Sequence, residues 1–250
     1  MKKNFTFTLV ASSDKLSLKK LIANRLSGAA VLEDLSIQII LVEDVCVSLV
    51  DDLLDYDICN SKIEVVLNKA SSINYQVKIS ENKDNINFEQ TCKTSERVLS
   101  FYDKQKTMSK ELNFKFIGQH SSAHVTCSVK GTNDRIIKIK TIQDHQASFT
   151  TSDLIVKSAM CQKSRLICDN LIRVPESLEK IQATQLNKNL LLGCDSRVIT
   201  VPKLEIESDD VDCKHGAAVS QLDEEQIFFL QSRGLDYCQA KNMLIEAFLN

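Results

Sequence analysis

The sequence predicts a mainly β protein: a right-handed parallel β-helix (β-solenoid) followed by a C-terminal α-helical hairpin. Short β-branched segments recur at irregular intervals from about Ile63, and few hairpin dipeptides such as Asn-Gly stand between them. A β-sandwich normally shows hairpin turns, whereas strands without hairpins or intervening helices favour stacked coils. From Asp223 onward the apolar residues adopt helical spacing.

The first segment, residues 1–62, is mixed in character. Lys15–Leu32 carries leucines at an imperfect helical spacing, which could form a helix. Ile37–Val50 is a nearly continuous apolar stretch that suits buried strand. We therefore interpret residues 1–62 as an N-terminal mixed α/β segment with no assigned function.

The second segment, residues 63–220, is the predicted β-helix core. Only six glycines and two prolines occur in the chain, so its turns must be made by Asn, Asp and Ser. The predicted strands lie at residues 63–67, 75–79, 114–118, 124–129, 136–142, 154–156, 166–168 and 189–193.

The third segment, residues 221–250, is the predicted helical region. Asp223 can cap a first helix, and Gly234 is placed to end it in the left-handed conformation. Asp236 then caps a second helix. The apolar stripe of that helix is expected to consist of Ala240, Met243, Leu244, Ala247 and Phe248.

Composition excludes several classes of function. The net charge is -2, which gives no support for nucleic-acid binding, and no apolar run is long enough for a membrane span. The apolar run near the N-terminus is broken by threonines and followed by Asp14 and Lys15, unlike a signal peptide. The nine cysteines are scattered singly without a CxxC pair, which indicates that most of them are buried thiols in a reducing compartment. We expect a cytoplasmic protein.

Motifs for catalysis are absent from the sequence. No P-loop and no GxSxG nucleophile motif occurs. His120 and His124 have the i, i+4 spacing that joins two metal ligands only on a helix, and their surroundings read as turn and strand. Glu205 and Glu207 alternate with apolar residues, which suggests a solvated strand face rather than a pair of catalytic carboxylates.

The run from Asn187 to Leu249 resembles the C-terminal region of the SufD branch of the SufB/SufD family, which belongs to the SUF iron–sulfur cluster assembly system. A weaker resemblance reaches back to about Leu112 through IQDHQASFTTSD (142–153) and Lys157. The motifs that carry the resemblance are NLLL (189–192), P-x-LEI (202–206), DDV-x-C-x-HGA (209–217), QLDEE (221–225), FFLQSRG (228–234) and LIEAF (244–248).

Particular positions favour SufD over SufB. SufB-like proteins read HEA where this chain has His215-Gly216-Ala217, and they carry a cysteine about where Asn187 stands. The chain departs from typical SufD by Ala218 and Ser220, which replace a Thr and a Gly. SufD relatives also have an N-terminal helical region and a longer C-terminal tail.

The resemblance implies a non-catalytic scaffold that pairs with a SufB-like paralogue and docks a SufC-like ABC ATPase. No cofactor is expected to be bound permanently. Iron or a nascent cluster would be held transiently at the interface with the SufB-like partner, with His215 as the ligand from this chain. Neutral imidazole is a borderline ligand for iron, which suits a site that must release its cargo.

Two further sets of residues follow from the resemblance. Cys213 lies two residues before His215, so both face one side of an extended strand; a structural thiol is favoured over a second ligand. The helical hairpin is expected to dock the ATPase, whose ATP-driven dimerisation would open the interface between the scaffold subunits. The hairpin residues predicted to bind it are Asp223, Ile227, Phe228, Leu230, Arg233, Gly234, Leu244 and Phe248.

Two alternatives remain open at this point. A carbohydrate-active β-helix enzyme would share the architecture, although a chain with 6% aromatic residues and no Trp offers little sugar-stacking surface. A degenerate structural subunit would keep the interface and lose the ligand chemistry.

Overall fold

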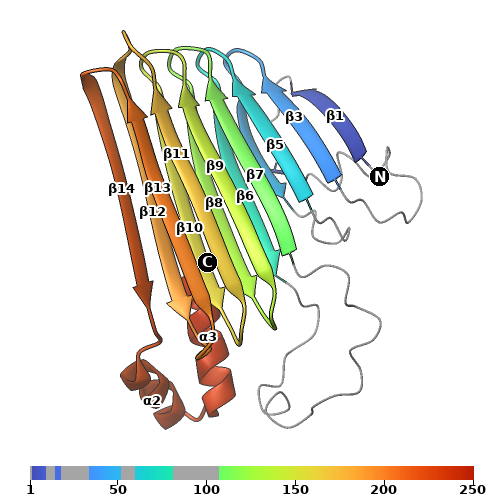
Figure 1. Cartoon of the computed structure of the whole chain (residues 1–250), viewed down its shortest axis with the longest axis vertical. Helices are drawn as coiled ribbons and strands as arrows, with labels where there is room; N and C mark the ends of the chain where they lie inside the picture. The colour runs from blue at the N-terminus through green and yellow to red at the C-terminus, as the bar shows by residue number, and fades with distance from the viewer. Residues whose placement is uncertain (1, 10–14, 18–33, 52–59, 81–106) are drawn as a thin grey trace.

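The computed structural model describes residues 2–9, 15–17, 34–51, 60–80 and 107–250. Within them the chain is mainly β, and two parallel sheets form a solenoid that is followed by two helices (Figure 1). The predicted parallel β-solenoid and the C-terminal helical hairpin are thereby confirmed.

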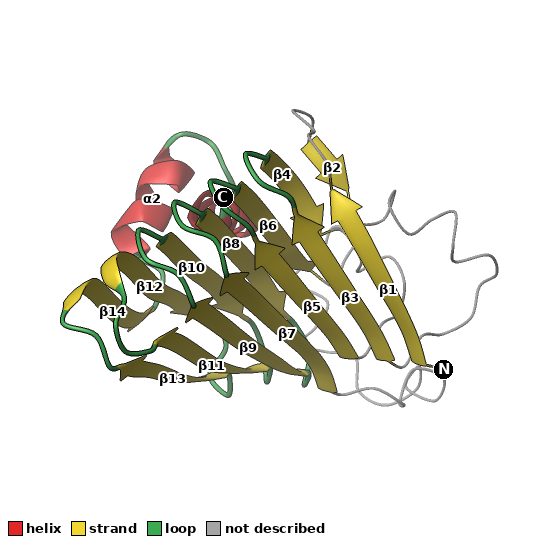
Figure 2. Cartoon of the chain, turned by 90° about the horizontal axis from the view of Figure 1, so that it is seen from above, coloured by secondary structure: helices red, strands yellow, loops and turns green. Residues whose placement is uncertain are grey.

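Successive strands of the described chain alternate between two seven-stranded sheets, which face each other across the core (Figure 2). Sheet A contains β1 (Lys2–Leu9), β3 (Asp34–Leu41), β5 (Asn60–Leu67), β7 (Thr107–Phe116), β9 (Ile136–His145), β11 (Arg165–Val174) and β13 (Arg197–Ile206). Sheet B contains β2 (Lys15–Ser17), β4 (Cys46–Asp51), β6 (Ser72–Ser80), β8 (Ser122–Gly131), β10 (Thr151–Met160), β12 (Glu179–Leu191) and β14 (Asp210–Ser220).

The strands of each sheet are parallel and in register, apart from a register shift between Glu179 and Ile181 where β12 pairs with β14. Thr151, for example, lies beside Ser122 on one side and Gln182 on the other. Paired residues therefore point the same way, and side chains form columns that run along the solenoid axis. The inward columns of the first rungs are mainly apolar, with Ile37 and Phe114 fully buried, and they also hold the buried ion pair of Lys110 with Asp51. Burial of the apolar side chains is the main source of cohesion.

The corners between strands use the left-handed conformation without relying on glycine. The corner residues Asp44, Ala70, His120 and Phe149 have φ between 52° and 61°. A serine hydroxyl commonly closes the corner by donating to the carbonyl three residues earlier, as Ser164 does to Cys161 at 2.7 Å. These hydrogen bonds satisfy backbone carbonyls at the bends, which explains how six glycines suffice.

The sheets continue through the predicted boundary at residue 62, because β3 pairs with β5 and β5 pairs with β7. The apolar stretch Ile37–Val50 lies mainly in two strands, β3 and β4, that are separated by a turn with Asp44 at φ 58°. The expected helix in Lys15–Leu32 falls largely outside the described residues, apart from the short strand β2.

The hairpin consists of α2 (Glu224–Ser232) and α3 (Tyr237–Leu249). Asp223 caps α2 by accepting a hydrogen bond from the Glu225 amide at 2.9 Å. Gly234, at φ 96°, ends α2, and its amide donates to the Gln231 carbonyl at 2.9 Å. Asp236 forms a capping box at the start of α3. The three predicted helix boundary residues are thus confirmed.

Helix α3 packs on the outer face of sheet B. Its Ile245 contacts the outward-facing Ala159 and Leu190, and the Ser128 hydroxyl donates to the Leu249 carbonyl at 2.7 Å. The predicted apolar stripe is partly wrong, because Ile245 is buried whereas Met243 is 49% exposed. The helix packs against both α2 and the sheet, and its buried face therefore differs from the face that the sequence spacing indicated.

Candidate functional site

The C-terminal end of the solenoid is open. In the described chain, β13 pairs only with β11 and β14 only with β12, so one edge of each terminal strand has no neighbour. Such edges present free backbone amides and carbonyls, which can pair with strands of another chain. The apolar side chains Leu204 and Val219 are 38% and 53% exposed at this end.

His215 lies on β14 at this open end. It pairs in register with Gln185, whose side chain points into the core and is 1% exposed. The His215 side chain therefore faces the inner side of the last rung. No further rung covers it among the described residues, so the imidazole is exposed. Its two ring nitrogens can be reached by a partner that seats on this end.

Cys213 faces the same side as His215 but has different surroundings. It pairs in register with the buried Ala183 and packs against the cluster that includes Ile181. Burial, together with the charge of Asp212, raises the pKa of its thiol. Because the thiolate is the form that binds metals, this favours the structural role over ligation.

Below the open end, the core becomes polar. The Asn170 amide donates to the Oδ1 of Asn187 at 3.0 Å, and the Thr141 hydroxyl donates to Asn170 at 2.9 Å. Both amide atoms of the Gln185 side chain and the Nδ2 of Asn187 are buried without a protein partner. A buried polar atom that lacks a hydrogen-bond partner costs about 1–3 kcal/mol. Sequence reasoning missed this interior, although the alternation of Gln185, Asn187 and Asn189 carried the signal.

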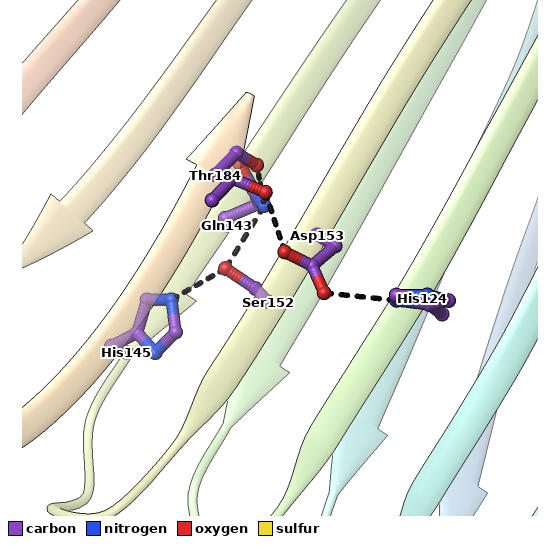
Figure 3. A network of polar contacts seen from close by, with 6 residues as sticks. All are labelled: His124, Gln143, His145, Ser152, Asp153 and Thr184. Atoms are coloured by element: carbon purple, nitrogen blue, oxygen red, sulfur yellow. Dashed lines mark hydrogen bonds and ion pairs between the residues drawn. The ribbon is translucent and has the colours of Figure 1, made fainter. Parts of the chain in front are cut away.

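The central motif of the resemblance, residues 142–153, forms a buried chain of hydrogen bonds (Figure 3). The Gln143 amide donates to the Ser152 hydroxyl at 2.9 Å, and the same hydroxyl lies 2.9 Å from the Nε2 of His145. The Nδ1 of His145 lies 2.7 Å from the Thr150 hydroxyl, which itself donates to the carbonyl of Ala147.

The hydroxyl donors fix the tautomer of His145. The Thr150 hydroxyl donates its proton to the Ala147 carbonyl, so it must accept a hydrogen bond from Nδ1–H of His145. The Nε2 of His145 then accepts a hydrogen bond from the Ser152 hydroxyl. Burial lowers the pKa of His145 to about 4, and the ring stacks on Phe116 with centroids 4.4 Å apart. A neutral ring locked from both sides joins the β9–β10 corner to the core, which is a structural role.

The chain of contacts continues to the outer face of sheet B through Thr184 (Figure 3). The Gln143 amide reaches the Thr184 carbonyl at 3.3 Å, and the Thr184 hydroxyl donates to Asp153. The other oxygen of Asp153 lies 3.0 Å from the Nδ1 of His124. His124 is thus engaged with a carboxylate on the outer face of sheet B, while the His120 ring stacks on Phe149.

The surface of the hairpin is partly aromatic. Phe228 and Phe229 are 72% and 56% exposed, and the Arg233 guanidinium lies 5.2 Å from the centroid of the Phe229 ring. Phe229 was not among the predicted docking residues, although its i, i+4 spacing to Arg233 was a signal for it. Ile227 is 2% exposed and packs inside the hairpin, so it is closed to a partner.

The other predicted docking residues divide into two kinds. Arg233 and Gly234 are exposed with the capping residue Asp223, whereas Leu230 and Leu244 are half-buried. Phe248 packs against the cluster of Ala159, Leu190 and Ile245 that anchors α3.

Among the described residues, no group of three or more His, Cys, Asp or Glu side chains could hold a metal ion. None of the helices in this part of the chain has the length and apolar character needed to span a membrane.

Comparisons with known proteins agree with the predicted resemblance. Residues 30–248 match the family model described as SUF system FeS cluster assembly, SufBD core domain. The chain is 35% identical over 131 residues to iron-sulfur cluster assembly protein SufD of Escherichia coli K12, covering 52% of this chain and 31% of that one. It is 31% identical over 107 residues to the Plasmodium berghei protein of the same name, covering 42% and 8%.

A third relative, an iron-sulfur cluster assembly SufBD family protein of Synechocystis, is 38% identical over 92 residues, covering 37% of this chain and 20% of the relative. The matched regions thus span less than a third of the length of each of these relatives. The SufD-type resemblance is confirmed, and the chain belongs to the SufBD core family of the SUF iron–sulfur cluster assembly system.

Proposed function

We propose that the chain is a non-catalytic scaffold subunit of a cytoplasmic SUF complex. In this proposal it pairs with a SufB-like paralogue through its open end and docks a SufC-like ABC ATPase through its helical hairpin. The observation that carries the proposal is the position of His215 on the inner side of an uncovered terminal rung. A partner that covers this end would place its own side chains beside His215 and so complete a binding site.

Pairing through the open end is supported by the shape and chemistry of the last rung. The edges of β13 and β14 lie at the same end of the two sheets, so a partner with a similar end can extend both sheets at once. The exposed Leu204 and Val219 would be removed from water, and the unsatisfied backbone groups would be paired.

The cargo proposed for this interface is iron or a nascent iron–sulfur cluster. His215 supplies a nitrogen ligand, and a thiolate from the partner would supply the softer one. A site divided between two chains binds tightly only while both are in place, which allows the cargo to leave when they separate. Cys213 remains a secondary candidate, because its pKa is raised by burial.

Docking of the ATPase is proposed on the exposed aromatic face of the hairpin. Phe228, Phe229 and Arg233 combine apolar area with a cation, the residue types that dominate protein interfaces. The chain has no P-loop of its own, so the ATPase partner would supply hydrolysis.

The degenerate-subunit alternative differs only in its chemistry. It predicts the same assembly but no contribution of His215 to the binding of iron or a cluster. The acidic residues offer little to the carbohydrate-active alternative, since Glu205 is paired with Arg173 at 2.9 Å and Asp169 with Lys203 at 2.8 Å.

Co-expression with a SufB-like and a SufC-like protein tests the proposal. The chain carrying a tag is expected to co-purify with both, and His215→Ala should preserve assembly while it lowers bound iron by at least about tenfold, the effect of removing roughly 1.4 kcal/mol or more of binding. Iron content and the visible absorption of the purified complex measure the effect.

His124→Ala is the matched control, because His124 is also exposed but lies on the outer face of sheet B. Its iron content should equal that of the unchanged chain. Failure of the three proteins to co-purify would refute the scaffold role, whereas assembly with unchanged iron in His215→Ala would favour the degenerate subunit.

A further inference from the structure

On the outer face of sheet A, charged side chains form ion pairs between neighbouring rungs. Opposite charges on neighbouring rungs pair with one another: Lys62 with Glu111 at 3.0 Å, Lys115 with Glu64 at 2.6 Å, and Lys203 with Asp169 at 2.8 Å. In-register columns make such pairing straightforward, because residues on adjacent rungs lie about 4.8 Å apart.

The outer face of sheet B carries a contrasting feature, here named the lysine row: Lys78, Lys157 and Lys188, with Lys130 beside it. Lys157 and Lys188 are direct neighbours in the register, and Ser128 separates Lys157 from Lys78. Two like charges on directly opposed residues destabilise a sheet. None of the four ammonium groups has a carboxylate partner in the part of the chain that the structure describes.

The lysine row stands close to the end of α3. The Ser128 hydroxyl, within the row, donates to the carbonyl of Leu249 in the last turn of that helix. A helix C-terminus carries about half a negative charge, which offsets one lysine in part but not four. Asp153 is the one carboxylate on the same outward face of β10, and it is taken up by His124 and Thr184. Among the described residues, none of the four lysines is therefore neutralised by an ion pair.

We propose that the lysine row is a docking site for an extended acidic segment of a partner protein. Carboxylates between the rungs would relieve the repulsion between Lys157 and Lys188 and pair with charges that have no other partner. The site goes beyond the proposed hairpin and open-end interfaces, because it lies on the outer face of the sheet and involves neither the aromatic residues of α2 nor β14.

The dimensions of the row favour a peptide over a small anion. From Lys78 to Lys188 it crosses three strand spacings, which is about 14 Å. One phosphate or carboxylate group covers a single pair of lysines, whereas an extended chain rises about 3.3 Å per residue and spans the row with four or five residues. The overall charge of -2 makes a general attraction of nucleic acid an inferior explanation.

Binding of a fluorescein-labelled hexaglutamate peptide to the full chain, followed by anisotropy at low salt, tests the proposal. The peptide is expected to bind, and K157Q/K188Q should weaken it by about fivefold, since two exposed ion pairs are lost. The matched control is K138Q/K140Q, which removes two exposed lysines from the outer face of sheet A. It should change the affinity by less than about twofold, as expected for screened charges at a distance.

Thermal unfolding of the same variants separates docking from a structural role. Removing like charges should leave the midpoint of K157Q/K188Q unchanged or raise it. A lower midpoint with unchanged peptide affinity would show that the lysines only stabilise the C-terminal end of α3, and this result would overturn the proposal. Absence of binding, equal losses in both variants, or tighter binding of an oligothymidylate of equal charge would overturn it as well.

Discussion

Among the individual residues, His145 and His215 have opposite surroundings. The ring of His145 is buried against Phe116 and is hydrogen-bonded at both nitrogens by hydroxyl groups. His215 lies on the inner side of the last rung, with its ring open to solvent. A ligand must offer a free lone pair, and His145 has none to offer. The difference comes from the position of each residue in the stack, since both lie in strands of the same solenoid.

The depressed pKa of His145 predicts how stability depends on pH. Its folded pKa of about 4 lies below the ordinary 6.5, so the unfolded chain binds more protons between these values. The free energy of unfolding should therefore fall as the pH is lowered through this window, by about 3 kcal/mol in full. Urea unfolding near pH 7 and near pH 4.5 measures the change.

His145→Gln is the comparison for this pH dependence. It should be less stable than the unchanged chain at neutral pH, because the hydroxyl contacts are altered, but its stability should fall less between neutral and acid pH. Equal slopes in the two proteins would show that other groups, such as the carboxyls, account for the acid sensitivity.

At the scale of elements, the corners decide whether the rungs can stack. A Cβ at Gly193 would lie 2.3 Å from the backbone carbonyl oxygen of Gln162 in the corner of the rung before. Gly118 faces the backbone of Lys69 in the same manner. Backbone cannot move aside as a flexible side chain can, so these two glycines are required for close approach.

Gly193→Ala is accordingly expected to destabilise the chain by about 2–3 kcal/mol, the cost of overpacking against fixed atoms. Gly216→Ala is the control, because its new methyl group would meet only a side-chain methyl of Leu186 at 3.1 Å. It should cost less than about 1 kcal/mol. Urea unfolding of the two variants measures the difference, and similar costs would contradict the role assigned to the corners.

The sequence predicted those elements whose signals are local. The helix boundaries at Asp223, Gly234 and Asp236 depend on neighbouring residues alone, so capping rules found them. The corners at Ala70 and Phe149 were not predicted, because the left-handed conformation there is imposed by the stack and not by the residue type. The family motif predicted His215 as a ligand, which stays a prediction; the exposure of its ring depends on register, which no local pattern specifies.

Across the whole molecule, the core changes along the axis. The rungs from β3 to β8 bury mainly aliphatic and aromatic side chains, with one buried polar group formed by Asp51, Lys110 and Tyr75, whereas those from β9 to β12 bury several amides, hydroxyls and His145. In a stack of rungs, each one is held mainly by its neighbours. The last rung has a neighbour on one side only, so one interface supports it instead of two.

An isolated chain with this open end is expected to self-associate. Its uncovered edges and the exposed Leu204 and Val219 can pair with a second copy when no partner is present. The double variant L204E/V219E should shift the chain toward monomer in sedimentation velocity, while its free energy of unfolding changes by less than about 1 kcal/mol. A monomeric unchanged chain at the same concentration would contradict this expectation.

The connection between β14 and α2 gives the molecule a mechanical property. Strand β14 ends at Ser220 and α2 begins at Glu224, so residues 221–223 form a tether whose full extension is about 10 Å. Within this tether, Leu222 packs against the cluster of Ala159, Leu190 and Ile245 on the outer face of sheet B, where α3 is also anchored. A force that draws α2 away therefore acts both on β14, the strand of His215, and on these contacts with β10 and β12. The load on the hairpin is shared between the outermost strand and the two strands that precede it in sheet B.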